Sequence, residues 1–256
     1  MKPDIKTKKL LGLKVAVTDP EEAAIKVLAD IEELGGEYIT FANVHALMMS
    51  RGDQEYRKAQ QEALMVMPDG KPLAWCLNKR GYDEAERVAG PDFFQRSLAM
   101  SSLTGKTHYL YGSSPETLEA LKKKIEKRYP GAKVVGYESP PFHDLSEEEE
   151  KAAIDRMNAS GADYIWIGLG APKQELFMLR HKGEAKGLML GVGAGFDFMA
   201  GTAKRAPVWM RWMGLEWLYR LLQDPGRLWK RYVVTNTQFI CLMLPYMFWM
   251  KKEDEK

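Results

Sequence analysis

Cysteine and histidine are scarce in this chain of 256 residues. The two cysteines, Cys76 and Cys241, allow at most one disulfide, which excludes a disulfide framework and a cysteine-rich metal cluster. This low cysteine content is typical of a protein in a reducing compartment. The four histidines have no spacing typical of metal ligands, so we expect no zinc site.

Strong net charge is also absent. The chain has 37 Lys and Arg residues and 35 Asp and Glu residues, so its positive and negative charges nearly balance. Hydrophobic residues make up 45% of it, as in an ordinary globular protein. The apolar runs are shorter than the roughly 20 residues that span a bilayer. The first residues include several lysines, but Lys14 interrupts their apolar stretch and no small-residue cleavage site follows. We therefore predict no secretion signal. We therefore expect a cytoplasmic protein, and near neutrality disfavours nucleic acid as a partner.

Charge and tryptophan are unevenly distributed. Residues 201–256 hold ten Lys and Arg against five acidic residues, and five of the seven tryptophans lie there. This break predicts two parts, an α/β core over residues 1–203 and a basic, Trp-rich appendage over residues 204–256 with a partner of its own.

Short β-branched or aromatic runs alternate with longer amphipathic stretches in the core. The runs predict strands at residues 13–17, 38–42, 63–67, 108–111, 133–137, 164–167 and 188–192. Caps, prolines and glycines predict helices at residues 21–34, 115–128, 147–158 and 172–181. Repeated alternation of strand and helix predicts an α/β fold with a mostly parallel sheet and helices on both faces. Ligands of such sheets bind at the carboxyl ends of the strands.

Pro68-Asp69-Gly70 directly follows the predicted strand at residues 63–67. Pro-Asp-Gly is strong turn chemistry, so a plain turn is one interpretation. In the other, Asp69 is a general base whose pKa is raised by partial burial.

Two glycine-rich segments follow later strands. At residues 168–175, glycines and the free amides of a helix start suit an anionic or polar ligand. Lys173 occupies the third glycine position of a dinucleotide fingerprint, which disfavours a nicotinamide cofactor. At residues 191–197, alternating glycines precede Asp197, whose carboxylate can accept hydrogen bonds from a ribose or sugar. A structural turn remains the alternative at both segments.

Residues 86–92 and the appendage carry the remaining charged candidates. Arg87 and Asp92 either pair with each other or face solvent, or Arg87 holds a carboxylate or phosphate. In the appendage, Asp224-Pro225 predicts a junction between two helices. Arg227 and Arg231 share one face of the second helix, which is either a solvated surface or a phosphate site.

The apolar run at residues 239–250 either lies in a membrane interface or packs against the body or a partner subunit. The chain has neither a nucleophile elbow nor a P-loop. It also lacks an Asp-x-Asp triplet, so a diphosphate leaving group would depend on arginines and helix-end amides.

In their order and spacing, these segments resemble the WecG/TagA/CpsF family, glycosyltransferase family 26. The resemblance covers nearly the whole chain. It rests on Asn43 with His45, residues 68–70, 86–92, 170–175, 191–197 and 205–207, Leu215-Glu216-Trp217, Arg220, Arg227 and Arg231-Tyr232.

The resemblance implies an inverting transferase that moves a sugar of the N-acetylmannosamine type, or a related hexose, from a UDP-sugar to a polyprenyl-diphosphate-linked saccharide. Such an enzyme would build a bacterial cell-surface polysaccharide at the inner face of the membrane, without a cofactor or a required metal. The implied fold is a Rossmann-like core with a helical appendage that helps to close the active site and reaches the membrane surface. Self-association into a homo-oligomer is compatible with this resemblance.

The resemblance also assigns roles to residues. Asp69 matches the proposed base, and Arg220, Arg227 and Arg231 match arginines that hold the diphosphate. The candidate substrate-binding residues are Thr40, Asn43, His45, Arg87, Asp92, Gly170, Lys173, Gln174 and Asp197. The chain departs from the family pattern at Phe41, where many members have Thr, and Thr40 stands one residue earlier.

Two other functions remain open. The first is a membrane-associated protein that binds a nucleotide or lipid without turnover, which an assay of UDP release in the presence of lipid acceptor would separate from an enzyme. The second is a nicotinamide-dependent oxidoreductase, which would bind NADH at residues 168–174.

Overall fold

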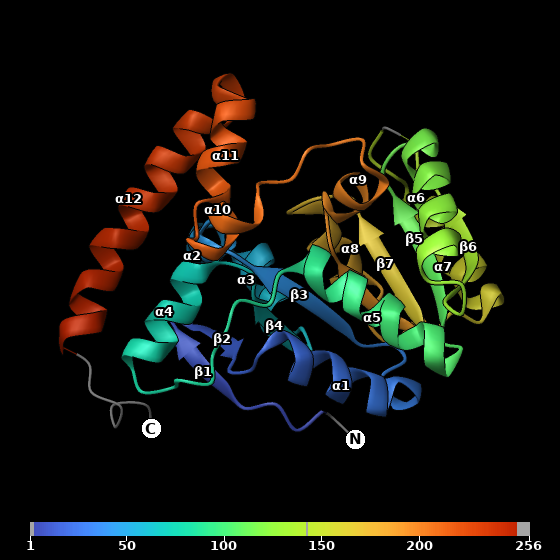
Figure 1. Cartoon of the computed structure of the whole chain (residues 1–256), viewed down its shortest axis with the longest axis horizontal. Helices are drawn as coiled ribbons and strands as arrows, with labels where there is room; N and C mark the ends of the chain where they lie inside the picture. Colours follow the sequence, from blue (N-terminus) through green and yellow to red (C-terminus); the bar gives the residue numbers. More distant parts are fainter. Residues whose placement is uncertain (1–2, 142, 250–256) are drawn as a thin grey trace.

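The structure is a computed structural model that describes residues 3–141 and 143–249, apart from the side chains of residue 227 and residues 245–249. Its central sheet has six parallel strands in the order β4-β3-β8-β7-β5-β6 (Figure 1). They are β3 Tyr38–Ala42, β4 Met65–Pro68, β5 Thr107–Gly112, β6 Lys133–Glu138, β7 Tyr164–Gly168 and β8 Leu188–Gly191. The expected α/β fold with a parallel sheet is therefore confirmed.

The first predicted strand lies outside this sheet. It forms β2 (Leu13–Ala16), which pairs antiparallel with β1 (Thr7–Leu10), a strand that the sequence pattern missed. Leu11 and Gly12 connect the two strands with φ angles of 50° and 90°. This left-handed backbone suits a two-residue hairpin turn, but leucine is unusual at such a position, so the turn carried little sequence signal.

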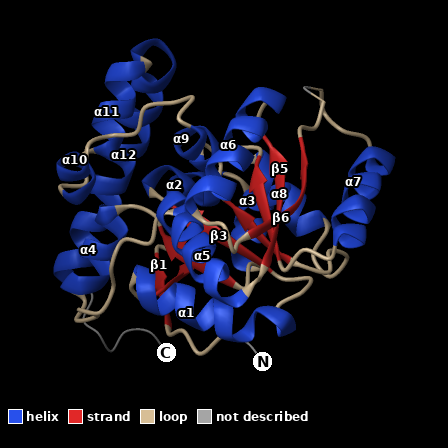
Figure 2. Cartoon of the chain, turned by 45° about the vertical axis from the view of Figure 1, so that its right-hand side comes forward, coloured by secondary structure: helices blue, strands red, loops and turns tan. Residues whose placement is uncertain are grey.

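Helices cover both faces of the sheet (Figures 1 and 2). Aromatic and aliphatic side chains bury one face under α1 (Pro20–Asp30), α5 (Gly90–Thr104), α6 (Pro115–Arg128) and α9 (Gly195–Ala200). The other face packs against α7 (Glu147–Ser160) and α8 (Lys173–Arg180), with α3 (Gln54–Gln61) beside α8. A short 3-10 helix, η1 (Ile31–Glu33), follows α1. Burial on both faces explains why the sequences of the central strands are nearly continuous apolar runs.

The segment between residues 44 and 104 contains helices that the sequence pattern did not predict. They are α2 (Val44–Gly52), α3, α4 (Lys71–Lys79) and α5. Pro72 and Pro91 stand in the first turns of α4 and α5, so a usable start signal was present for both. The hairpin packs with α2 and α4 in a smaller apolar cluster of its own.

In the described part of the chain, three helices follow α9: α10 (Val208–Trp212), α11 (Glu216–Gln223) and α12 (Pro225–Trp249). We call them the tail helices. The junction at Asp224-Pro225 lies where the sequence predicted it. In Figure 1 the long α12 lies beside α2 and α4, and contacts to both helices hold it there.

The apolar run in α12 packs partly on the body. Phe239 and Met243 are only 8% and 2% exposed and lie one helical turn apart in the cluster of the hairpin, α2 and α4. Ile240 and Leu244 on the same helix are exposed. The side chains of residues 245–250, which complete the predicted run, lie outside the described part. None of the described helices has the length and apolarity needed to cross a bilayer.

Candidate active site

Parallel pairing places the ends of β3 and β4 side by side, because parallel strands end at the same edge of a sheet. Asn43 follows β3 and caps α2, its side-chain oxygen accepting a hydrogen bond from the backbone N–H of Ala46 at 3.1 Å. Asp69 follows β4, and its backbone N–H donates to the carbonyl of Ala42 at 2.9 Å. Both side chains are thus fixed by elements that the apolar core holds in register.

A cavity of about 430 Å³ opens between this edge and the tail helices. Its lining combines residues of the body with residues of α10–α12 and their connections. The predicted site residues among them are Asn43, His45, Asp69, Arg87, Arg220 and Arg231. Trp75, Trp217 and Tyr232 add aromatic surface to the same cavity. The structure therefore completes this site with side chains from both parts of the chain.

Arg87 lies at the centre of the charged residues. One of its terminal nitrogens, Nη1, is 3.0 Å from Asp92 Oδ2, so the predicted pairing of these two residues is present. The other, Nη2, is 2.6 Å from Glu216 Oε2 and 3.6 Å from Asp69 Oδ1. Its Nε donates to the backbone carbonyl of Asp69 at 3.2 Å. The protein's own carboxylates therefore occupy the guanidinium of Arg87.

Asp92 links this group to the tail. Arg205 donates both terminal nitrogens to its carboxylate at 2.6 and 2.9 Å, and Arg211 approaches it at 3.3 Å. Burial opposes the charge of Asp92, but Arg205 and Arg87 outweigh it and hold the pKa of this carboxyl below its usual range. Sequence reasoning missed Arg205, Arg211 and Glu216 as members of the group. The basic composition of the tail pointed to its arginines but not to Glu216, an acid of the tail that contacts them.

The surroundings of Asp69 favour its neutral form. Burial raises the pKa of Asp69 to about 7; Glu216 and Asp92 add to the effect, while Arg87 and Arg220 oppose it. A carboxylate with a pKa near neutrality suits a general base. Burial, followed by the charge of Arg231, lowers the pKa of His45 to about 4, so its imidazole is neutral at physiological pH.

The glycine-rich segments meet farther along the same edge, after β7 and β8. The backbone N–H of Gly170 donates to Gln174 Oε1 at 3.1 Å, and Gln174 Nε2 donates to Glu175 Oε1 at 2.9 Å. A Cβ atom at Gly191 would lie 2.8 Å from the end of the Met178 side chain and 2.9 Å from Gln174 Nε2, so the absence of a side chain there leaves room for both. Hydrogen bonds within the first segment therefore orient the amide group of Gln174 next to the second segment.

Other predicted site residues lie apart from the cavity lining. Asp197, on α9, accepts a hydrogen bond from the Ser113 hydroxyl at 3.0 Å, beyond the end of β5. Lys173 pairs at 2.7 Å with Asp144 on the surface. Thr40 is fully buried and donates its hydroxyl to Gln60 Oε1 at 2.7 Å inside the body. The side chain of Arg227, on α12, lies outside the described part of the structure.

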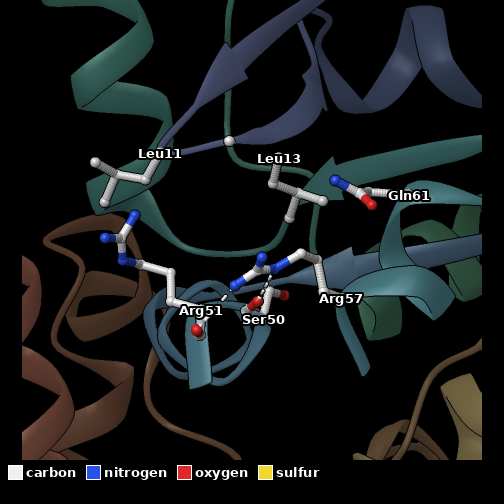
Figure 3. A pocket seen from close by; sticks show the side chains of 7 residues that line it. Leu11, Leu13, Ser50, Arg51, Arg57 and Gln61 are labelled. Atoms are coloured by element: carbon white, nitrogen blue, oxygen red, sulfur yellow. Dashed lines mark hydrogen bonds between the residues drawn. The ribbon is translucent and has the colours of Figure 1, made fainter. Parts of the chain in front are cut away.

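A second cavity, of about 370 Å³, lies between the hairpin and the end of α2 (Figure 3). Arg57 donates there to the backbone carbonyls of Ser50 and Arg51 at 2.6 and 2.9 Å, which caps the end of that helix. This arginine therefore has a structural role. Over residues 3–141 and 143–249, no three or more His, Cys, Asp or Glu side chains gather into a metal-binding group.

The chain is similar to known proteins over a region that includes both the sheet and the tail helices. The chain matches the Glycosyl transferase WecG/TagA/CpsF family over residues 8–253. It is 29% identical over 202 residues to the N-acetylglucosaminyldiphosphoundecaprenol N-acetyl-beta-D-mannosaminyltransferase of Bacillus subtilis (strain 168), covering 78% of this chain and 77% of that protein. Because the family match includes almost every element described above, this protein belongs to the WecG/TagA/CpsF family of glycosyl transferases.

Proposed function

We propose that this protein is an inverting transferase that moves a sugar of the N-acetylmannosamine type from a UDP-sugar to a polyprenyl-diphosphate-linked saccharide. The product would enter a bacterial cell-surface polysaccharide. The name of the Bacillus subtilis relative supports the sugar and the acceptor class. The observation that carries the proposal is Asp69, with a pKa of about 7, in a cavity that also contains Arg220 and Arg231.

In the proposed reaction, Asp69 takes the proton of an acceptor hydroxyl. The hydroxyl oxygen then forms a bond to the anomeric carbon of the donor sugar on the face opposite UDP. The bond between that carbon and the diphosphate oxygen breaks, and UDP leaves with the electron pair. Attack from the opposite face inverts the configuration of the sugar. General-base assistance of this kind contributes about 10²–10⁴-fold to the rate.

The tail arginines would stabilise the departing diphosphate. Arg220 and Arg231 line the cavity, and Arg227 belongs to the same helix as Arg231. Guanidinium groups bind phosphate oxygens through paired, charge-assisted hydrogen bonds, which are strong where water is excluded. We assign this charge stabilisation to the arginines rather than to a metal ion. The glycine-rich edge around Gly170 and Gln174 would hold the nucleotide, and Asp197 would accept hydrogen bonds from its ribose.

The exposed apolar side chains of the tail helices support association with a membrane surface. Trp209 and Trp212 of α10 are 59% and 75% exposed, and Trp229 of α12 is also exposed. Tryptophan side chains next to basic residues suit the interface of an anionic membrane. The lipid of the acceptor lies in that membrane, so we place the enzyme on its inner face.

Replacement of Asp69 tests this proposal. Asp69→Asn keeps the shape of the side chain but removes the base, so release of UDP in the presence of lipid acceptor should fall by about 10²–10⁴-fold while UDP binding stays nearly unchanged. Asp155→Asn, at an exposed position on α7, is the matched control.

Normal turnover by Asp69→Asn would contradict the role of the base. Absence of UDP release by the wild-type protein, with a panel of UDP-sugars and a polyprenyl-linked acceptor, would favour a binding protein without turnover.

A further inference from the structure

Within the described part of the tail, the carboxylate of Glu216 enters the group of arginines beside Asp69. Glu216 lies in the first turn of α11, and its side chain is mostly buried. Its carboxylate is 2.6 Å from Arg87, 3.4 Å from Arg205 and 3.8 Å from Arg220. Nothing in the proposed reaction uses this acid, although it contacts Arg87 directly.

Glu216 and Asp69 compete for the same nitrogen of Arg87. Arg87 Nη2 is within hydrogen-bond distance of Glu216 Oε2 at 2.6 Å, whereas Asp69 Oδ1 is 3.6 Å away. Arg87 contacts Asp69 more closely through the backbone, because its Nε donates to the Asp69 carbonyl. The guanidinium is therefore held next to Asp69 while its Nη2 is directed to the tail.

We propose that Glu216 is a positioning residue that draws the Arg87 guanidinium away from the Asp69 carboxylate and so keeps Asp69 available as a base. The inference rests on the proposed function, because it assumes that Asp69 accepts the proton. It also makes the docked tail a requirement for a competent base, since the acid that engages Arg87 comes from α11.

The charges around Asp69 predict the direction of the effect. The charges that act most on it are those of Arg87 after α4, Asp92 on α5, and Glu216 and Arg220 on α11. Arg205 before α10 also interacts with it, and His45, Lys71, Arg211 and Arg231 line the same cavity. Arg205 and Arg211 are held mainly by Asp92. Loss of the Glu216 charge would remove a repulsive neighbour of Asp69 and would free Arg87 Nη2 to pair with it. Both changes favour the charged form of Asp69, so both lower its pKa and weaken it as a base.

The test is the dependence of kcat/KM on pH, which reports the free enzyme. In Glu216→Gln we expect the acid limb of the profile to move about one pH unit below that of the wild type. The plateau above the limb should fall by up to about tenfold, because a weaker base accepts the proton less readily. Glu216→Asp keeps the charge at a greater distance from Arg87, so its limb should lie between the other two and its plateau should recover in part.

A fall of the plateau with the limb at the wild-type pH would show that Glu216 only holds the tail in place, and would overturn the inference. If Glu216→Gln fails to fold, the limb of Glu216→Asp decides: a downward shift supports the inference and an unmoved limb overturns it. Glu119→Gln, at an exposed position on α6, is the control and should leave the profile unchanged. The proposed function fails separately, through normal turnover by Asp69→Asn.

Discussion

Glu175 is a buried acid that the proposed reaction does not use. It is 1% exposed, and Oε1 accepts a hydrogen bond from Gln174, while Oε2 has no hydrogen-bond partner among the described residues. Burial raises the pKa of Glu175 from its ordinary 4.5 to about 7. The folded protein thus holds this proton more tightly than the unfolded chain does. The associated stability is full below pH 4.5 and is lost as the pH rises through about 7.

We therefore expect Glu175→Gln to raise the free energy of unfolding at pH 8 by about 1–3 kcal/mol and to leave it nearly unchanged near pH 4.5. The amide has a similar shape, can still accept from Gln174 and carries no charge to bury. Urea denaturation at the two pH values measures the difference, with Glu126→Gln on the exposed face of α6 as control. Equal destabilisation at both pH values would contradict this account of the buried acid.

Helix α10 offers a clean test of membrane association, since Trp209 and Trp212 are exposed and lie outside the cavity lining. Replacement of both by serine should weaken sedimentation with anionic phospholipid vesicles by about tenfold or more, because each indole loses its burial in the interface. Turnover of a soluble acceptor analogue should not change. Leu103→Ser, at a 90% exposed position on α5, is the matched control.

Unchanged sedimentation of the double variant would exclude α10 as the contact with lipid. Truncation of the chain before α12 ends is a poorer test, because Phe239 and Met243 pack into the apolar cluster of the hairpin, α2 and α4. Their loss would expose that cluster and destabilise the body along with any membrane contact.

At the level of the whole protein, the candidate site exists only where the body and the tail helices meet. The body supplies Asp69 and Arg87, and the tail supplies Glu216, Arg220 and Arg231. Arg211, Arg220 and Arg231 of the tail helices line the same cavity as the base, where a leaving diphosphate would need cations. This arrangement predicts that charge stabilisation is built into the chain itself.

Sugar transfer should therefore persist when divalent ions are removed. We expect a chelator such as EDTA to change the rate of UDP release by less than about twofold, whereas Arg220→Ala with Arg231→Ala should lower it by at least about 100-fold. Lys127→Ala, at an exposed position on α6, controls for the loss of surface charge. Loss of activity with the chelator and recovery with added manganese would refute the assignment to arginines.

Local patterns in the chain were enough to predict the sheet and one part of the site. Strands that are buried on both faces have apolar sequences, and capping residues between them indicated several helices. This alternation of strands and helices predicted the parallel α/β fold. Asp69 could be placed at the ligand-binding edge because it directly follows a predicted strand, whereas Asn43 was named through the family resemblance. The hairpin turn at Leu11 was missed because leucine is unusual in a left-handed turn position. The helices at residues 44–61 were missed although Asn43 and Asp53 cap their starts, so a usable signal was present for both.

The partners of each charged side chain were decided by packing between distant segments. Arg87 and Glu216 are 129 positions apart and meet only because α12 docks on α2 and α4 and carries α11 to the end of β4. The same docking buries one face of the apolar run in α12. Tertiary packing also buries Thr40, whose hydroxyl donates a hydrogen bond to Gln60 inside the body. Periodicity reports which face of an element is buried, but not which other element covers it. The environment that sets the basicity of Asp69 is therefore a property of the folded chain alone.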